Sequence, residues 1–455
     1  MREAADSTGP IEGLPRSDVS VGVGLVGLAG LLGWIVFCRA FPEIASALNL
    51  PVPHARLDGP YAALCGLVAS GVPMVLWSVF VDKVHRNPST GLDWGKRADA
   101  EATRSVTFTK LTGLWATWAV LAAMYAIGRW YWDGQYLFAM EVLGAVAIPA
   151  LVLSIPYVFW LDRRMVNPRD ATWHFGAFLL AREAWDRDKV VGHWRAWIIK
   201  GFFGAFMISI LPGGFAEVVN SNLGDLATQP GALAAALIGL LFVIDVQIGT
   251  VGYVMTMRPL DTHIRSGNPF LAGWIAALLC YPPFVYGITG AGGLLSYENN
   301  APGWQHWLEG EPWLMALWGG WLVVLTGMYA WATVVFGLRF SNLTYRGVIT
   351  HGPYRFTRHP AYLSKNLFWW SAALPFLVTN GGLLEAVRNV VGLALVSGIY
   401  YWRARTEEAH LLREDAKYRE YHAWMSRNGP LPVAIGALGH AISRGRSQQP
   451  LHPAE

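Results

Sequence analysis

Residues 231–250 read GALAAALIGLLFVIDVQIGT and contain a single charged residue, Asp245. A helix needs roughly 20 apolar residues to cross the hydrocarbon core of a bilayer, so this stretch predicts a transmembrane helix. Similar stretches recur along the chain, which is 53% hydrophobic and only 15% charged. Soluble domains carry about 25% charged residues. The expected fold class is therefore all-α, a polytopic transmembrane helical bundle.

About ten spans are expected. Their ranges are 20–41, 60–82, 111–130, 136–160, 195–215, 231–257, 270–296, 313–338, 362–378 and 383–402. Lysine and arginine gather in both tails and in alternate connections, whereas the remaining connections hold only Arg56 and Arg129. Basic residues collect on the cytoplasmic side, so we expect both termini and the connection after the eighth span there. The expected location is integral and multi-pass, in a bacterial inner membrane.

Charge and cysteine content narrow the choice of partners. The net charge of +4 is too small to suggest nucleic acid. Cys38, Cys65 and Cys280 all lie in apolar stretches and form neither a disulfide framework nor a metal cluster, so no metal is expected. Lys200 lies near a span end and is expected to extend toward the interface. Asp245 is expected either to line a substrate or ion route or to form a hydrogen bond between helices.

A basic, aromatic loop follows the eighth span, where residues 346–363 read RGVITHGPYRFTRHPAYL. Gly352 and Pro353 mark a turn, and Pro360 forces His359 toward an extended backbone. A rigid loop of this kind offers backbone groups, ring faces and a histidine to an adenosine-like ligand. The same residues would also suit a loop whose arginines only meet lipid headgroups.

A second polar stretch follows the tenth span, where residues 403–421 read RARTEEAHLLREDAKYREY. The pattern predicts an amphipathic cytoplasmic helix that lies against the bundle. An ionised carboxylate only accepts hydrogen bonds, so Glu407 or Glu408 could hold ribose hydroxyls or an ammonium group. The alternative is a solvated helix in which Glu407 pairs with Arg403 and Glu408 with Arg405, at little gain in stability.

Taken together, the two stretches resemble the isoprenylcysteine carboxyl methyltransferase family and the related phospholipid methyltransferases. The matching pieces are Gly352-Pro353-Tyr354-Arg355, Arg358-His359-Pro360 with Tyr362, then Arg405, Glu407-Glu408, Leu411, Tyr418, Tyr421 and the closing Leu431-Pro432. The resemblance covers about residues 313–435 and none of the first 300. Ala409 stands where family members often carry a longer acidic run, which leaves the acceptor open.

The resemblance implies an integral membrane methyltransferase that uses S-adenosylmethionine at the cytoplasmic face. Its acceptor would be a lipophilic small molecule or lipidated substrate, with a carboxylate or a lipid amine as the methylated group, and membrane lipids would surround it. The implied cofactor-binding residues are Gly352, Tyr354, Arg358, His359, Pro360, Tyr362, Leu363, Glu407 and Glu408. The implied catalytic residues are Arg405, which would hold an acceptor carboxylate, and Glu408.

Two other functions stay open. Membrane sterol reductases, which bind NADPH, have a similar length and span number and an Arg-His-Pro-like loop; residues 371–375 are similar to their corresponding helix. The paired glutamates favour the methyltransferases. A transporter or lipid-binding protein with a degenerate site is the third reading.

The expected domains follow the same division of the chain. They are a cytoplasmic tail at 1–19, a transmembrane region of open role at 20–300, a methyltransferase-like membrane domain at 313–435 and a disordered tail at 436–455.

Overall fold

The structure, a computed structural model, describes residues 13–129, 136–289, 292–430 and 433. The regular structure of the described part is helical, as expected, apart from an isolated bridge between Leu92 and Met165 and one antiparallel pair of two-residue strands, β1 (Ser266–Gly267) and β2 (Thr344–Tyr345). Helices satisfy their own backbone hydrogen bonds, which is what a chain in lipid requires. The expected tail at 436–455, the closing Leu431-Pro432 and residues 1–12 lie outside the described residues.

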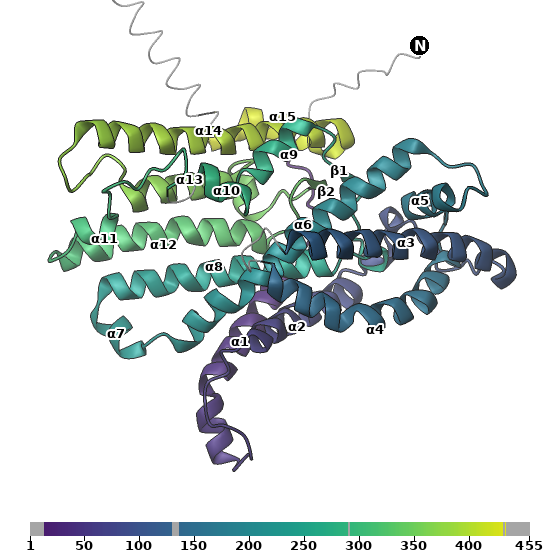
Figure 1. Cartoon of the computed structure of the whole chain (residues 1–455), viewed down its shortest axis with the longest axis horizontal. Coiled ribbons are helices and arrows are strands. Elements are labelled where there is room, and N and C mark those ends of the chain that lie inside the picture. The colour runs from purple at the N-terminus through teal and green to yellow at the C-terminus, as the bar shows by residue number, and fades with distance from the viewer. Residues whose placement is uncertain (1–12, 130–135, 290–291, 431–432, 434–455) are drawn as a thin grey trace, which may run out of the picture.

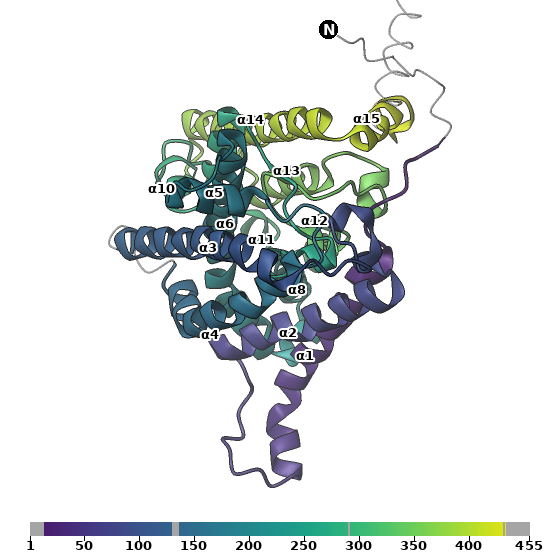
Figure 2. The ribbon, with the colours of Figure 1, turned by 90° about the vertical axis from the view of Figure 1, so that its right-hand side faces the viewer.

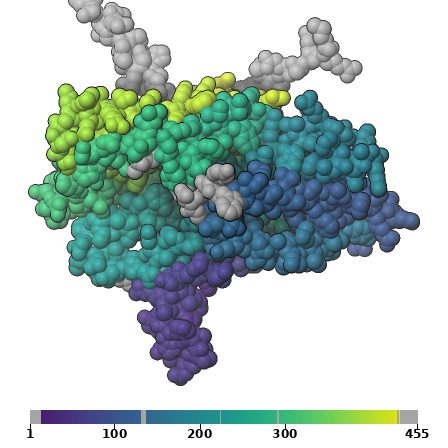
Figure 3. Space-filling view, in the orientation of Figure 1, coloured from purple at the N-terminus to yellow at the C-terminus, as the bar shows by residue number. Residues whose placement is uncertain are grey.

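Eight helices in the described part are long and apolar enough to cross a membrane. They are α1 (Val21–Ala47), α2 (Pro60–Leu76, continued by η1, Trp77–Val81), α3 (Ala100–Gly128), α4 (Leu137–Asp162), α6 (Arg187–Asn220), α8 (Pro230–Val254), α12 (Pro312–Val334) and α14 (Leu383–Glu414). These helices support an integral membrane protein. Figures 1 and 2 show α14 along one side of the molecule and α1 with α2 on the opposite side. The end of α1 projects from the body in Figure 3.

Two of the ten expected spans are not long helices. In the segment 270–296, outside residues 290 and 291, the helices are α9 (Leu271–Leu278) and α10 (Phe284–Ile288). Pro282 and Pro283, which lack the N–H that a helix needs, separate them. The segment 362–378 contains α13 (Pro360–Ala373), whose 14 residues span about 21 Å, less than the roughly 30 Å hydrocarbon core. Leu374 ends α13 in a left-handed conformation, directly before Pro375.

Both segments nevertheless join the two faces of the bundle. Each leaves the face that carries the β1–β2 pair. At the other face, the backbone N–H of Thr379 donates to the carbonyl of Asn300 at 2.9 Å. The Asn300 amide in turn donates to Glu385, in the first turn of α14, at 2.7 Å. The two segments therefore connect opposite ends of the bundle, although only eight helices in the described part are long and apolar enough to cross a membrane.

Shorter elements complete the chain. They are η2 (Val84–Arg86), η3 (Pro88–Thr90), α5 (Ala171–Leu180), α7 (Leu223–Thr228), η4 (Arg258–Leu260), α11 (Trp304–Trp307), η5 (Gly337–Arg339), η6 (Gly352–Arg355) and α15 (Ala416–Asn428). The largest buried apolar cluster lies among α1, α2, α6, α8 and α12. Within it, the Thr333 hydroxyl of α12 donates to Asp245 of α8, so Asp245 forms the interhelical hydrogen bond that was one of its two expected roles.

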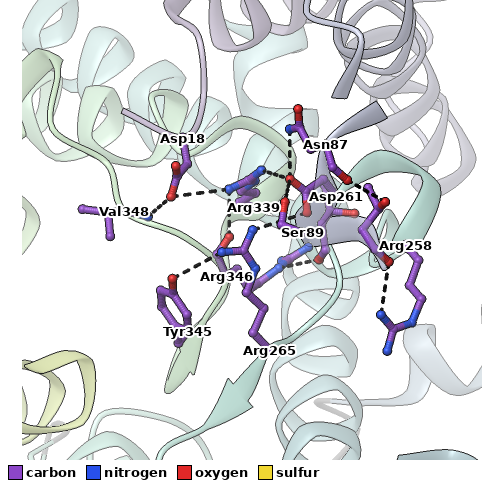
Figure 4. A network of polar contacts seen from close by, with 12 residues as sticks. Asp18, Asn87, Ser89, Arg258, Asp261, Arg265, Arg339, Tyr345, Arg346 and Val348 are labelled. Carbon is purple, nitrogen blue, oxygen red and sulfur yellow. Dashed lines mark hydrogen bonds and ion pairs between the residues drawn. The ribbon is translucent and has the colours of Figure 1, made fainter. Parts of the chain in front are cut away.

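The connections that the sequence places on one side do meet at one face, where Asp261 is the central acceptor (Figure 4). Asp261 is 1% exposed and accepts hydrogen bonds from Ser89 at 2.7 Å, Asn87 at 3.1 Å and Arg339 at 2.7 Å. Arg265 lies 3.3 Å from its other oxygen. The connections after the second, sixth and eighth spans are thereby joined. We call these five residues the Asp261 network.

Candidate active site

The twin glutamates lie on α14, which continues past the expected end of the tenth span at 402. It runs to Glu414, and the separate helix α15 starts after Asp415. The expected amphipathic helix at 403–421 is therefore split between the last turns of α14 and the start of α15. Because α14 is continuous, Glu407 and Glu408 are held on a rigid helix beside the start of α13.

Glu408 is the shared acceptor of two arginines and a histidine. It is 3% exposed. Its Oε1 lies 2.6 Å from Nε of Arg358 and 3.0 Å from Nε2 of His359, and its Oε2 lies 2.8 Å from a guanidinium nitrogen of Arg405. A buried carboxylate without such donors would be strongly unfavourable. The solvated-helix alternative is correct about the Glu408–Arg405 pair, which forms. It is wrong about solvent exposure, because Glu408 is buried.

Glu407 faces the neighbouring aromatic layer. The Tyr362 hydroxyl donates to its carboxylate, and Nε of Arg403 lies 3.5 Å from the same oxygen. Arg403 is 3% exposed, and its guanidinium lies 5.1 Å from the centre of the Tyr362 ring. The rings of His359 and Tyr362 stack with a 9° interplanar angle and centroids 5.7 Å apart. We call Arg358, His359, Tyr362, Arg403, Glu407 and Glu408 the glutamate site.

Glycine and proline explain how the loop reaches α14. Gly352 has φ +60°, and a Cβ there would lie 2.7 Å from the Trp331 indole nitrogen, so only glycine lets the loop pack on α12. Pro360 occupies the first turn of α13, where its missing N–H costs nothing. The Tyr421 hydroxyl of α15 donates to the carbonyl of Tyr354 at 2.6 Å and holds the loop from the other side.

A cavity of about 180 Å³ lies beside the glutamate site. Among the expected cofactor-binding residues, Tyr354, Arg358, His359, Tyr362 and Glu407 line it. Typical small-molecule sites hold roughly 300–1,000 Å³, so a nucleotide-sized ligand requires side chains at this cavity to move. Arg358 is the obvious one, because its side chain is 23% exposed.

Comparison with known families now decides the nature of this segment. Residues 314–413 match the isoprenylcysteine carboxyl methyltransferase (ICMT) family. The match spans α12, the loop, α13 and α14, and it confirms the resemblance seen in the sequence. No curated protein and no solved structure matches the chain. The ICMT segment, together with the apolar helices, supports a membrane methyltransferase.

The expected site residues in and beside the ICMT segment divide into three groups. Five line the cavity, as given above. Glu408 and Arg405 do not line the cavity. Arg358 and His359, which do line it, donate to Glu408, and the Arg405 side chain is 58% exposed. Gly352, Pro360 and Leu363 do not line it; the first two shape the loop, and Leu363 is 41% exposed.

Several cavity residues were not among the expected site residues. Arg403 donates to Asn342 at 2.6 Å, and both line the cavity with Tyr281, Tyr400 and Lys365. The sequence offered a reason to include Arg403 in the site, because it lies one helical turn before Glu407 and can pair with it. Asn342 had none, because its partner lies 61 positions away in the chain.

Proposed function

We propose that this chain is an S-adenosylmethionine-dependent methyltransferase that acts on a lipophilic acceptor at the cytoplasmic face of the membrane. The observation that carries the proposal is the closure of the Arg358-His359 turn onto Glu407 and Glu408 beside a cavity, within the ICMT segment. The concentration of basic connections around the same face supports the cytoplasmic side.

The donors and acceptors at this cavity fit the cofactor. Glu407 can accept from hydroxyl or ammonium groups, and Arg403 can donate to a carboxylate. The rings of Tyr281, Tyr362 and Tyr400 line the same space and suit a cationic sulfonium. When bound, S-adenosylmethionine would supply the electrophilic methyl group.

The chain's own residues would align the reactants and exclude water. Alignment alone can lower a barrier by about 7–11 kcal/mol. Glu408 orients the His359 ring beside the cavity, which is part of the preorganisation that alignment needs. An acceptor carboxylate is already ionised and needs no base.

The charges of the cavity favour a carboxylate over an amine as the acceptor. Lys365 and Arg403 both line the cavity, and the positive charge of each side chain attracts an anion. An amine acceptor would meet the same two cations and would also have to lose a proton. Leu363 and Leu367 on the outer side of α13 are each 41% exposed, which supports contact between this helix and lipid.

The test is methyl transfer from radiolabelled S-adenosylmethionine by the purified full chain, with extracted membrane lipids as acceptors. We expect label in the organic phase. In parallel, S-adenosylhomocysteine should raise the thermal unfolding midpoint and NADPH should not. Protection by NADPH alone would favour the reductase reading and reject the proposal. Absence of both labelled lipid and protection by S-adenosylhomocysteine would favour the non-enzymatic reading.

A further inference from the structure

A second cavity, of about 450 Å³, has none of the residues of the glutamate site in its lining. Its walls come from the residues before and in α5, the first half of α6, the connection from α8 to α9 and the last residues of α14. Its charged residues other than histidine are Lys189, Arg195, Lys200, Arg258, Arg265, Arg413, Asp170 and Glu414. We call this the basic cavity. Most of it lies outside the ICMT segment, and the proposed methyl transfer does not use it.

Positive charge exceeds negative charge here, and the existing contacts do not balance it. Asp170 is shared between Arg258 at 3.9 Å and Lys110 at 3.3 Å. Arg265 is paired with Asp261 of the Asp261 network. Within the described residues, Arg195, Lys200 and Arg413 form no ion pair with any carboxylate.

Two buried nitrogen atoms also lack partners. In the described part of the chain, Nε of Arg265 and Nδ1 of His263 are buried and form no hydrogen bond. Both residues line the basic cavity. Buried polar atoms are nearly always paired, so such atoms beside a cavity rich in cations indicate a bound acceptor.

The cations of the basic cavity differ in how far they are buried. Lys189 and Arg413 are exposed, whereas Arg195 and Lys200 are half-buried on α6. The Lys200 ammonium lies 4.2 Å from the centre of the Trp197 ring. Half-buried charges of one sign repel each other with little screening, and an anion between them would remove this cost.

The position of the cavity along α6 indicates the source of the anion. With 34 residues, α6 is about 51 Å long and exceeds the roughly 30 Å hydrocarbon core, so one or both ends reach the headgroup region. The cavity uses the first four turns of α6. Apolar side chains beside it are exposed, namely Val191 and Ile198 on α6 and Leu271 on α9. Cations at headgroup level with exposed apolar neighbours suit a phospholipid.

We propose that the basic cavity binds a phosphate group carried by the headgroup of an anionic lipid. Arg195 and Lys200 hold the phosphate, with Arg265 and His263 donating from the α8–α9 connection. The site is distinct from the glutamate site but adjoins it. Ser266 and Gly267 line the basic cavity, and Ser266 contacts His410, which lines the other cavity, at 3.0 Å.

The experiment measures thermal unfolding of the purified full chain in mixed micelles or nanodiscs. Phosphatidylglycerol, phosphatidylcholine and sodium phosphate are titrated separately. Phosphatidylglycerol should raise the unfolding midpoint above the value in phosphatidylcholine. The double variant Arg195→Gln/Lys200→Gln should need at least roughly tenfold more phosphatidylglycerol for the same rise.

Three controls make the result specific. Arg182→Gln removes an exposed cation outside the cavity and should leave the titration unchanged. Arg195→Lys with Lys200→Arg keeps both charges and should retain most of the protection. The unfolding midpoint in phosphatidylcholine alone reports whether each variant folds.

Two outcomes would overturn the proposal. One is equal protection of the wild type by phosphatidylglycerol and phosphatidylcholine, which needs no variant to fold. The other is equal protection by sodium phosphate, which would assign the cavity to a free anion instead of a lipid.

Discussion

The glutamate site and the basic cavity lie at one face of the same bundle, yet their charges are balanced differently. Glu408 accepts hydrogen bonds from two arginines and His359, and Glu407 is held by Tyr362 and Arg403, so the carboxylates of the glutamate site are already paired. The basic cavity holds more cations than its carboxylates can pair. The first site therefore has to open for its ligand, whereas the second presents cations that an anion could pair.

The largest expected effect removes the support that both sites share. Asp261→Ala leaves Arg265 and Arg339 without their carboxylate and should lower the free energy of unfolding by roughly 3–5 kcal/mol. Thermal unfolding in one lipid composition measures this. Glu309→Ala, at an exposed position, is the control. A loss as small as that of the control would mean that the Asp261 network does not hold the loops together.

The next largest effect is expected at the glutamate site and tests whether it functions independently of the basic cavity. Glu408→Gln keeps the shape but leaves Arg358, His359 and Arg405 without an anion, so methyl transfer should fall at least roughly a hundredfold. Protection by phosphatidylglycerol should stay at the wild-type level. Glu420→Gln, at an exposed position on α15, serves as the control. If both readouts fell together, the two sites would not be independent.

A smaller effect tests one contact inside the glutamate site. Tyr362→Phe keeps the ring that stacks on His359 but removes the hydroxyl that donates to Glu407. Hydrogen bonds to charged groups contribute about 1.5–3 kcal/mol, so binding of S-adenosylhomocysteine should weaken roughly tenfold. Calorimetric titration measures the change. Tyr401→Phe, at an exposed position of α14, should bind as the wild type does.

The smallest effect concerns pH and the N-terminal segment. Burial alone would raise the pKa of Asp18, but Lys417 at 2.5 Å, the Val348 N–H and Arg339 hold that pKa below its usual value. Asp18 therefore stabilises the fold above about pH 4, and this contribution is lost as the pH falls through the lowered pKa. The wild type should lose its advantage over Asp18→Asn in acid, as unfolding midpoints between neutral and acidic pH will show. A constant difference at every pH would contradict this sign.

The helical class and the positions of most spans could be predicted because twenty apolar residues in a row are a local property of the sequence. The interruptions at Pro282-Pro283 and before Pro375 coincide with prolines, but apolar composition does not show whether a span kinks or ends there. The alternation of faces predicted from the basic residues depends on their sum in each connection and not on helix length, so the shortened segments do not change that prediction.

The two halves of the glutamate site could be predicted as motifs, and their meeting was expected from the family resemblance. Two features were beyond the sequence. The burial of Glu408 depends on α14 continuing past its apolar part, and the contact of Arg403 with Asn342 depends on tertiary packing. The basic cavity could not be predicted because its cations come from α6, the connection from α8 to α9 and the end of α14, which lie far apart in the sequence.

The most direct test of the central claim is ultraviolet crosslinking of radiolabelled S-adenosylmethionine to the purified full chain, followed by peptide mapping. The account predicts label in peptides that contain residues 339–363 or 400–421, and competition by S-adenosylhomocysteine. Label confined to peptides outside these two ranges, or label that S-adenosylhomocysteine does not displace, would contradict it.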